Sequence, residues 1–528
     1  MFRSPHPDVE IPDLSVYDFL FGSLAESERD RVAITNGATG AQASYRELIA
    51  QIDAIAGSLA ADGIGVGDVV ALHASNSPAF VATFHGILRA GATVTTVNAL
   101  ATATDITSQL TNAGATRLIT VSVLLPQASD AAARLGLSDD AVIVLDGAEG
   151  HRSFADLIGS GLHAPEVSFD PATHLAVLPY SSGTTAAPKG VMLTHRNLVA
   201  NVAQVVPMIE VDADDSILAV LPFFHIYGIT VLLNLALRAR ATLVTMPRFD
   251  LPEFLRIVQD ERCTYLFVAP PIAVALAKHP MIGDYDLSSV RAILSGAAPL
   301  DEAIASAVAT RLHCRVLQGF GMTEMSPVAQ VHRLNQPGTP LGSVGVTVPN
   351  MECRLVDPET GDDIPVPETG VSAAGELQCR GPNVMVGYLG NDEATRAAMT
   401  DDGFLRTGDV ATVSADGFVT IVDRLKELIK YKGYQVAPAE LEAVLLSHPS
   451  IADAAVIGVP DADREELPKA FVVLQPGAEL SADQVIAFVA ERVAPYKKVR
   501  QVEMIDAIPK SSAGKILRKD LRASAVRA

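Results

Sequence analysis

The first third of the chain alternates apolar runs of strand length with longer runs of helical periodicity. Residues 68–73 and 91–97 are rich in apolar or β-branched side chains and have the length of a strand, whereas residues 77–88 repeat apolar side chains at helical spacing. Parallel strands need a crossover connection, usually a helix, so this alternation is typical of a buried parallel sheet. We therefore expect an α/β fold built on doubly wound sheets.

The same rhythm continues through the middle of the chain and then changes. Residues 264–268, 292–294 and 315–317 have the pattern of further buried strands, each followed by a turn rich in Gly, Pro or Ala. Turns at the carboxyl ends of such strands are where α/β folds bind ligands. From about residue 352 to 422 the segments become shorter and richer in turns, which predicts antiparallel hairpins in a small β-barrel-like part.

Beyond this point the chain mixes helix and strand patterns again. They predict a helix over residues 438–448, a strand over 453–458 and a helix over 481–493. A chain of 528 residues exceeds the size at which one core keeps growing, so at least two domains are expected. We place a large N-terminal domain at residues 1–422 and a small α+β C-terminal domain at residues 423–528.

One apolar segment is long enough to cross a membrane. Residues 216–237 carry no formal charge, and about 20 apolar residues suffice to span a bilayer. The stretch is interrupted by Pro222, His225, Tyr227, Gly228 and Asn234. Polar residues are costly inside a membrane, so we expect no spanning helix here.

Charge and cysteine content narrow the possible partners. The chain has 61 acidic against 40 basic residues, a formal charge of −21, which argues against nucleic-acid binding because that needs a basic face. The cysteines, Cys263, Cys314, Cys353 and Cys379, are scattered and support neither a disulfide framework nor a zinc site. The first ten residues lack the pattern of a signal peptide and the last residues are not a peroxisomal address, so we expect a cytoplasmic location.

Residues 180–190, Tyr-Ser-Ser-Gly-Thr-Thr-Ala-Ala-Pro-Lys-Gly, concentrate groups that bind phosphate. Hydroxyls, backbone N–H groups and one ammonium group can wrap the phosphates of a nucleotide. The segment is not a Walker A loop, because Lys189 is followed by Gly190 and Val191 where that motif has Ser or Thr. Composition alone also allows a solvated loop without a ligand.

Five further segments carry candidate chemistry, although each one alone has an ordinary structural explanation. They are residues 221–228 (LPFFHIYG), 318–324 (QGFGMTE), 407–409 (TGD), 423–436 (DRLKELIKYKGYQV) and 509–518 (PKSSAGKILR). Taken singly, they could be a helix start with a core histidine, a glycine-rich turn with a solvated Glu, a simple turn and charged surface segments. After residue 494 nine basic residues stand against three acidic ones, a local reversal of the overall charge.

Taken together and in this order, the six segments resemble the adenylate-forming (ANL) superfamily across nearly the whole chain. The resemblance is to its acyl-CoA synthetase branch and is strongest for 4-coumarate:CoA ligase-like enzymes. It implies an ATP-dependent acid:CoA ligase that forms an acyl-AMP with release of pyrophosphate and then an acyl-CoA thioester, using ATP, Mg²⁺ and coenzyme A. Ala186 stands where the family usually has Gly, which predicts a stiffer phosphate loop.

The resemblance implies a role for residues in each segment. Catalysis is implied for Lys515, Thr184, Glu324 and Lys430, and Glu324 would also lie on the magnesium side, directly or through water. Nucleotide binding is implied for Ser181, Ser182, Gly183, Thr185, Lys189, Gln318, Gly319, Thr323, Asp409, Arg424 and Lys426. The acid pocket would include His225, Tyr227, Ala297, Gly319 and Met322, and coenzyme A would contact Arg248, Lys432 and Gly433. A mobile C-terminal domain would turn about a hinge at residues 423–426.

The identity of the acid is left open by the sequence. An aromatic slot with few polar groups favours a planar hydroxycinnamate-like acid, while a deep slot would take a medium- or long-chain fatty acid. An amino acid is disfavoured because no carboxylate lies near residues 223–227 to bind its ammonium group. A luciferase-type oxidase would use the same adenylate. A non-catalytic nucleotide-binding regulator is disfavoured by the presence of Lys515 and Glu324, and the protein could be a monomer or a homodimer.

Overall fold

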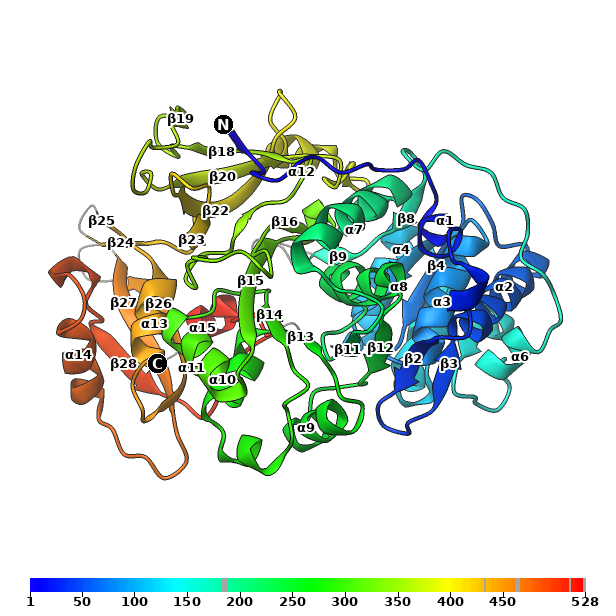
Figure 1. Cartoon of the computed structure of the whole chain (residues 1–528), viewed down its shortest axis with the longest axis horizontal. Coiled ribbons are helices and arrows are strands. Elements are labelled where there is room, and N and C mark those ends of the chain that lie inside the picture. Colours follow the sequence, from blue (N-terminus) through cyan, green and yellow to red (C-terminus); the bar gives the residue numbers. More distant parts are fainter. Residues whose placement is uncertain (182–187, 432–433, 461–465, 512–513, 526–528) are drawn as a thin grey trace.

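The computed structural model describes residues 1–181, 188–431, 434–460, 466–511 and 514–525. Figure 1 shows a large part built on three sheets and a small part that follows β23 (Val419–Arg424). The small part lies beside α10 (Pro270–Lys278) and α11 (Glu302–Leu312) of the large part. The expected α/β architecture with a small α+β region near the C-terminus is confirmed.

The first sheet has the order β21-β10-β8-β5-β4-β6-β7 among the described residues, and β9 also pairs with β10. Its strands are β4 (Val69–His73), β5 (Thr93–Thr96), β6 (Arg117–Thr120), β7 (Val142–Val144), β8 (Leu175–Val177), β9 (Tyr180–Ser181), β10 (Lys189–Thr194) and β21 (Gly387–Tyr388). Strands β4 to β8 are parallel, as the alternating pattern predicts. Strand β10 is antiparallel to β8 and β21, and this brings Val191 beside Tyr388.

Short helices connect and cover this sheet (Figure 1). They are α1 (Val16–Phe21), α2 (Tyr45–Ala61), α3 (Pro78–Arg89), α4 (Ala103–Ala113), α5 (Leu125–Leu135) and α6 (Phe154–Ile158), with 3₁₀ turns η1 (Glu26–Glu28), η2 (Ser122–Leu124) and η3 (Asp139–Ala141). The predicted helix at residues 77–88 is α3, which begins at the N-cap Ser77 with Pro78 in its first turn. A serine cap followed by proline is a favourable helix start, so the sequence placed this boundary well.

The second sheet has the order β17-β16-β15-β14-β13-β11-β12-β2-β3 within the described ranges. Its strands are β2 (Val32–Asn36), β3 (Gln42–Ser44), β11 (Ser216–Ala219), β12 (Thr242–Thr245), β13 (Tyr265–Val268), β14 (Ala292–Ser295), β15 (Arg315–Gly321), β16 (Val328–Val331) and β17 (Val346–Thr347). The run from β15 to β2 is parallel, so the carboxyl ends of β13, β14 and β15 meet at one edge. Its further helices are α7 (His195–Ile209), α8 (Leu235–Ala239) and α9 (Leu251–Asp260), with the 3₁₀ turns η5 (Pro280–Asp284) and η6 (Thr323–Met325).

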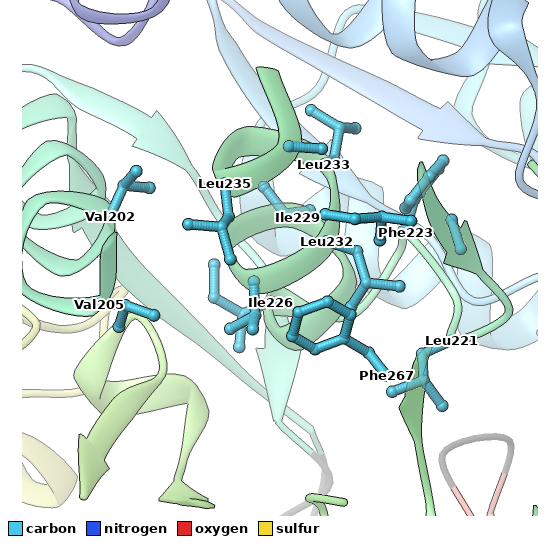
Figure 2. Packing of buried hydrophobic residues seen from close by; sticks show 14 of the residues in the cluster. Val202, Val205, Leu221, Phe223, Ile226, Ile229, Leu232, Leu233, Leu235 and Phe267 are labelled. Atoms are coloured by element: carbon cyan, nitrogen blue, oxygen red, sulfur yellow. The ribbon is translucent and has the colours of Figure 1, made fainter. Parts of the chain in front are cut away.

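The long apolar segment at residues 216–237 lies inside the protein. It forms β11, a loop, the π-helical turn η4 (Gly228–Asn234) and the start of α8. Figure 2 shows Ile229 and Leu232 of η4 packed between Val205 of α7 and Phe267 of β13. In the part of the chain that the structure describes, no helix is both long enough and apolar enough to cross a membrane.

The third sheet is antiparallel and has the order β1-β18-β20-β22-β23, with β19 paired to β18. Its strands are β1 (Phe2–Arg3), β18 (Glu352–Val356), β19 (Asp363–Ile364), β20 (Gly375–Arg380), β22 (Leu405–Val413) and β23, and α12 (Asp392–Ala398) lies between β21 and β22. These are the antiparallel strands predicted for residues 352–422.

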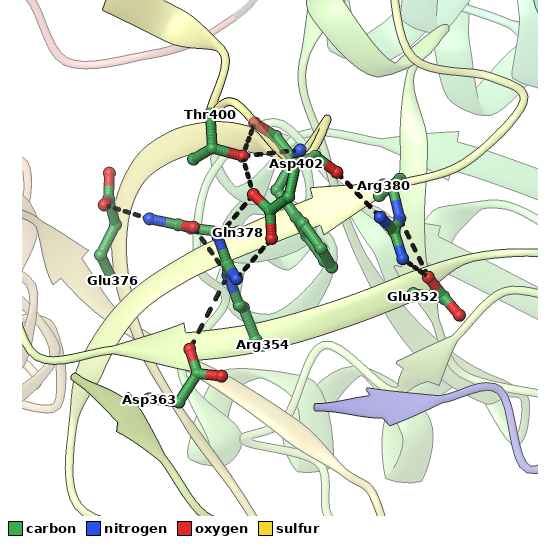
Figure 3. A network of polar contacts seen from close by, with 9 residues as sticks. Glu352, Arg354, Asp363, Glu376, Gln378, Arg380, Thr400 and Asp402 are labelled. Carbon is green, nitrogen blue, oxygen red and sulfur yellow. Dashed lines mark hydrogen bonds and ion pairs between the residues drawn. The ribbon is translucent and has the colours of Figure 1, made fainter. Parts of the chain in front are cut away.

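Figure 3 shows a network of polar contacts around Arg354 and Gln378 on this sheet. Arg354 lies over the ring of Phe404 at 4.3 Å and donates to the amide oxygen of Gln378 at 3.0 Å. Gln378 donates to Glu376, and the carboxylate of Glu376 accepts the backbone N–H of Gly408 at 3.3 Å. Gly408 has a φ of +70°, which favours glycine. The network therefore holds the backbone directly before residue 409.

The small region after β23 has its own apolar core, and its described strands form two sheets, β24-β25 and β26-β27-β28. Its elements are β24 (Ile429–Tyr431), β25 (Tyr434–Val436), α13 (Pro438–Leu446), β26 (Ile451–Pro460), β27 (Glu466–Leu474), α14 (Ala482–Ala490), η7 (Pro495–Lys497), β28 (Gln501–Met504) and α15 (Arg518–Ala525). Buried side chains from Ile429 to Val499 form one cluster, separate from the large core that ends at Val419. The predicted helices at 438–448 and 481–493 are present as α13 and α14, and the predicted strand is the longer β26.

Candidate active site

The candidate site lies at the edge where the carboxyl ends of β13, β14 and β15 meet. Ligands of open α/β sheets bind outside the carboxyl ends of the strands. Ser295 at the end of β14 is the register partner of Gln318 in β15, so Gly296 and Ala297 follow one strand beside Gly319 in the next. Of the sequence-predicted acid-pocket residues, Ala297 and Gly319 are thereby brought to one edge.

Tyr227 fixes the shape of this edge. A Cβ atom added at Gly296 would lie only 2.8–3.0 Å from the ring and hydroxyl of Tyr227, so the ring lies directly on the glycine. The hydroxyl of Tyr227 is buried without a hydrogen-bond partner among the described residues, and burial raises the pKa of Tyr227. The phenol therefore stays protonated and keeps a donor available for a bound molecule.

His225 contributes an apolar, uncharged surface next to Tyr227. Burial lowers the pKa of His225 to about 4, so its ring is neutral at physiological pH. The ring lies 4.7 Å from that of Phe224, centroid to centroid. Met322, directly after β15, is half-buried and packs against the main core. A neutral imidazole and a thioether suit an organic acid better than a second charged group would.

The loop that carries His225 and Tyr227 is held by a residue that the motifs do not indicate. Asn76 is buried and donates to the carbonyls of Ala219 and Leu221 at 2.9 Å each. Its amide oxygen accepts the backbone N–H of Phe223 at 2.8 Å. Asn76 thus satisfies three backbone groups of a buried loop, which explains how that loop keeps one conformation.

Glu324 joins the two ends of the phosphate-binding segment to the β15 turn. Its buried carboxylate accepts a hydrogen bond from the hydroxyl of Tyr388 at 2.8 Å and from that of Ser181 at 3.4 Å. The ammonium group of Lys189 lies 4.8 Å from the centroid of the Tyr388 ring. Burial and the neighbouring Glu324 raise the pKa of Tyr388. The predicted residues Ser181, Lys189 and Glu324 are therefore brought together. Tyr388, which contacts two of them, was not predicted from the sequence.

This cluster can hold a magnesium ion only together with a ligand. Among the described residues no group of three or more His, Cys, Asp or Glu side chains could hold a metal. Mg²⁺ is commonly bound through one or two carboxylates plus substrate phosphates. The single buried carboxylate of Glu324, at the ends of the phosphate segment, fits that arrangement.

Asp409 offers a buried carboxylate with one oxygen in use and one free for a ligand. Its Oδ1 lies 3.3 Å from Nε of Arg424, its register partner on β23. Its Oδ2 is buried and has no partner among the described residues. Burial raises the pKa of Asp409, while the charges of Arg424 and Lys515 lower it. A buried, unpaired acceptor is costly unless a ligand satisfies it, and a pair of hydroxyl groups would do so.

Lys515 is brought from the small region to Asp409. Burial and the nearby Arg424 lower the pKa of Lys515 to about 8, and Asp409 opposes this shift. Its loop is closed by hydrogen bonds between Ser511 and Lys515, in which Ser511 N–H donates to the Lys515 carbonyl at 2.8 Å. A Cβ atom at Gly514 would lie 3.3 Å from Cβ of Ala269, so this loop contacts the start of α10.

The structure does not bring three predicted residues to this site. Lys430 is exposed on β24, the strand that follows β23, and its backbone N–H donates to Glu466. Lys426 and Arg248 are also exposed. Their assigned roles stay predictions.

Gln318 lies in β15 and holds two loops through its side chain, whereas Thr323 begins the turn η6 after that strand. The amide of Gln318 accepts from Leu300 N–H at 3.0 Å and donates to the carbonyls of Leu300 and Leu341. Its polar groups are therefore used to hold two loops, and a direct side-chain contact with a nucleotide would have to break these bonds. Thr323 begins η6 and is half-buried. Ser182, Gly183, Thr184, Thr185, Ala186, Lys432 and Gly433 lie outside the described residues.

Comparison with known proteins gives matches over nearly the full length. The family model described as AMP-binding enzyme matches residues 22–389, and the AMP-binding enzyme C-terminal domain matches residues 440–515. The chain is 42% identical to 4-coumarate–CoA ligase 5 of Oryza sativa subsp. japonica and 41% identical to 4-coumarate–CoA ligase 2 of Nicotiana tabacum. Each alignment covers 99% of this chain and 97% of the relative.

Two solved structures are similar over the same extent. ATP-bound MatB from Rhodopseudomonas palustris superposes with a TM-score of 0.87 at 30% identity, covering 97% of this chain and 99% of that one. The anthranilate CoA ligase AuaEII in complex with anthranoyl-AMP gives a TM-score of 0.89 at 27% identity, covering 97% of both chains. The large and small parts therefore match in one superposition.

Proposed function

Since the chain belongs to the AMP-binding enzyme family, we propose that it couples a hydroxycinnamate-like aromatic acid to coenzyme A. The resemblance drawn from the six segments is confirmed at the level of the family. The chain is an ATP-dependent, AMP-forming acid–CoA ligase, with ATP, Mg²⁺ and coenzyme A as its further reactants. The aromatic character of the acid is the part that we propose.

One observation carries this choice of acid. The hydroxyl end of the Tyr227 ring packs against Gly296, and its buried hydroxyl has no hydrogen-bond partner among the described residues. A ring packed on a glycine makes an aromatic wall, and an unpaired donor beside it suits an acid that carries a polar ring substituent. A fatty acid would leave this donor unsatisfied, which makes it the weaker candidate.

The site residues explain how the first step proceeds. A carboxylate is a poor electrophile, so its oxygen attacks the α-phosphorus of ATP, the bond to the pyrophosphate oxygen breaks, and a mixed anhydride with AMP forms. Negative charge grows on the phosphate oxygens, and the ammonium group of Lys515 would stabilise it. Asp409 would accept the ribose hydroxyls, and Glu324 would hold Mg²⁺ together with phosphate oxygens.

The second step replaces AMP by the thiol. The coenzyme A sulfur attacks the acyl carbon, the bond to the AMP oxygen breaks, and AMP leaves with the electron pair. We propose that the small domain, residues 423–528, turns about residues 423–426 between the two steps. Lys430 keeps its proposed catalytic role, and Arg248, Lys432 and Gly433 keep their proposed contacts with coenzyme A. The charge of Lys515 interacts with that of Asp409 whereas Lys430 is exposed, which is compatible with one domain presenting two faces in turn.

An assay of AMP release with a panel of acids tests the proposal. We expect cinnamates with a ring hydroxyl to give the highest kcat/KM, benzoates lower values and fatty acids the lowest. Release of AMP and pyrophosphate should depend on ATP, Mg²⁺ and the acid. A preference for a medium- or long-chain fatty acid would overturn the aromatic assignment, and nucleotide binding without any pyrophosphate release would favour a non-catalytic regulator.

Replacing Tyr227 by alanine should change the choice of acid and leave ATP binding nearly unchanged. The ring supplies the aromatic wall of the pocket, and losing its contact area should lower kcat/KM for the best aromatic acid by about tenfold or more, since burying a ring is worth over about 1.4 kcal/mol. Steady-state kinetics over the acid panel and over ATP measure both effects. Tyr227→Phe keeps the wall and removes only the hydroxyl, so it should lower only the preference for hydroxylated rings. Equal changes for acid and ATP would remove Tyr227 from the pocket.

The adenylation rate should fall as pH rises through about 8. Burial and Arg424 lower the pKa of Lys515 to about 8, and only the protonated ammonium can stabilise phosphate charge, so this contribution is present below that pH and lost above it. The quantity to measure is kcat/KM as a function of pH, because this profile reports the pKa values of groups in the free enzyme. In Lys515→Arg the guanidinium stays charged, so the decline near pH 8 should disappear. A decline of the same shape in both proteins would assign it to another group.

We also propose that the enzyme works in the cytoplasm. All four cysteines are free thiols, which is typical of proteins in a reducing compartment. Cell fractionation with detection of the native protein tests this proposal.

A further inference from the structure

Helix α10 of the large part touches the small domain at both of its ends. At its start, Ala269 and Pro271 lie against Gly514, next to Lys515. At its last residue, the ammonium group of Lys278 donates to the backbone carbonyl of Leu446 in α13 at 3.0 Å. Figure 1 shows α10 and α11 facing the small domain on the side where α13 and α15 lie. One rigid element therefore contacts both the Lys515 loop and a helix end.

The Lys278 contact is of a kind that stabilises an orientation. Leu446 is the last residue of α13, and the final carbonyls of a helix have no partner within the helix. The partial negative charge at a helix C-terminus attracts a cation. Lys278 is half-buried, and burial lowers its pKa. Partial burial costs the ammonium group some of its hydration free energy, and the hydrogen bond to the Leu446 carbonyl offsets that loss.

Helix α10 is itself well fixed, so it can act as a rigid support. Arg311 of α11 donates to the carbonyls of Leu276 and Ala277, at 3.3 and 3.0 Å. These are the carbonyls next to Lys278 at the end of α10. The backbone of Lys278 is therefore held rigidly within the large domain.

Helix α13 is held at its other end by the hinge. The carboxylate of Asp423 accepts the backbone N–H of Ala439, in the first turn of α13, at 2.9 Å. Nine helical residues span about 13 Å at 1.5 Å per residue. A rotation about residues 423–426 moves the far end of α13 more than the end beside Asp423, so the bond from Lys278 to Leu446 must break in that rotation.

The lysine content of the large domain singles out the same residue. Residues 1–422 contain two lysines, Lys189 and Lys278, while their other strongly basic side chains are all arginines. One of these lysines lies in the phosphate-binding segment, and the other makes the contact with the small domain. A compact ammonium group can reach a single carbonyl, whereas the planar guanidinium group favours bidentate partners.

We infer that Lys278 is a positioning residue for the adenylation step. Its hydrogen bond to Leu446 at the end of α13 keeps the small domain in the orientation that brings Lys515 near Asp409. This bond breaks when the domain turns for thioester formation. This inference rests on the proposed function, in which one domain serves two steps in turn. Lys278 acts through Lys515 and has no contact with the reacting atoms.

The test compares the two half-reactions in Lys278→Met, which keeps a long side chain without the ammonium group. Adenylate formation in a single turnover should slow about tenfold, the usual scale for one hydrogen bond from a charged donor. Thioester formation from synthetic acyl adenylate should equal or exceed that of the parent enzyme. Lys278→Arg keeps a charged donor, so its adenylation rate should lie closer to the parent than to Lys278→Met. Equal slowing of both half-reactions, or equal loss in both variants, would overturn the inference.

A readout independent of activity separates this inference from the proposed function. Lys426 is exposed in the hinge segment, so trypsin should cut after it faster in Lys278→Met, because the small domain spends more time undocked. Arg256→Met removes a cation from α9 that pairs with Glu253 and Asp260, and both cleavage and half-reactions should stay as in the parent. An unchanged cleavage rate in Lys278→Met would overturn the inference. If cleavage changes while the parent makes no AMP from any acid, the proposed function fails and the role of Lys278 in docking stands.

Discussion

Replacement of Lys515 by alanine should slow acyl-adenylate formation by about two to three powers of ten. That is the scale for losing one preorganised group that stabilises transition-state charge. The charge of Lys515 interacts with those of Asp409 and Arg424, and Arg424 is already paired with Asp409. No other lysine of its loop can replace it, because Lys510 is bound to Asp453 at 2.5 Å.

The two half-reactions should respond differently to this change. Thioester formation from synthetic acyl adenylate should remain within about threefold of the parent, since the phosphate chemistry that needs Lys515 is complete by then. Rapid-quench measurement of adenylate and of acyl-CoA separates the two steps. Lys510→Ala removes a lysine five residues away from the same loop and serves as the matched control, with adenylation near the parent rate. Parallel loss of both half-reactions in Lys515→Ala would contradict an exclusive role in the first step.

The parallel sheets could be predicted because their signal is local. The strand predicted at residues 264–268 is β13 (Tyr265–Val268) and that at 292–294 is β14 (Ala292–Ser295). A strand buried on both faces has a continuous apolar run, which needs no knowledge of its neighbours. The strand predicted at 315–317 continues to Gly321 as β15. The added residues are Gln318, Gly319, Phe320 and Gly321. Gln318 pairs with Ser295 of β14, and the last three pair with β16, so neighbouring strands rather than a local apolar pattern extend β15.

The site could be predicted only where its residues stand in recognisable segments. Asp409 and Lys515 are over a hundred residues apart in the chain, and no periodicity or spacing brings them together. Resemblance to a family did so, and the structure places their charges in interaction. Tyr388, Asn76 and Lys278 lie outside those segments. Tyr388 reaches the site through β10–β21 pairing, Asn76 holds a buried loop, and Lys278 makes a contact between domains. None of these long-range contacts leaves a local pattern in the sequence.

Lys515 and Lys430 lie in different surroundings in the structure. The family resemblance implies a catalytic role for both residues, but Lys430 is exposed on the β24–β25 hairpin. A charged side chain on a solvated surface has no preorganised partner for phosphate chemistry. The orientation of the small domain in the structure is therefore compatible with the proposed role of Lys515 in adenylation.

Replacement of Asp409 by asparagine should lower kcat/KM for ATP by about a hundredfold. The buried Oδ2 has no partner among the residues that the structure describes, so two ribose hydroxyls would be its natural donors. Hydrogen bonds to a charged acceptor contribute about 1.5–3 kcal/mol each, and asparagine keeps the shape while losing the charge and one acceptor. The KM for the acid should change little, because the acid pocket is built on Tyr227 and Gly296.

The nucleotide analogue 2′,3′-dideoxy-ATP distinguishes loss of this contact from damage to the fold. The parent enzyme should use the analogue about a hundredfold less well than ATP, since its two ribose donors are missing, whereas Asp409→Asn should use both equally poorly. Burial raises the pKa of Asp409, which means that the charged carboxylate opposes folding at neutral pH, so the variant should unfold at a temperature no lower than the parent. Continued discrimination against the analogue by Asp409→Asn would place the ribose elsewhere, and a lowered unfolding temperature would show that the carboxylate supports the β22–β23 pairing through Arg424.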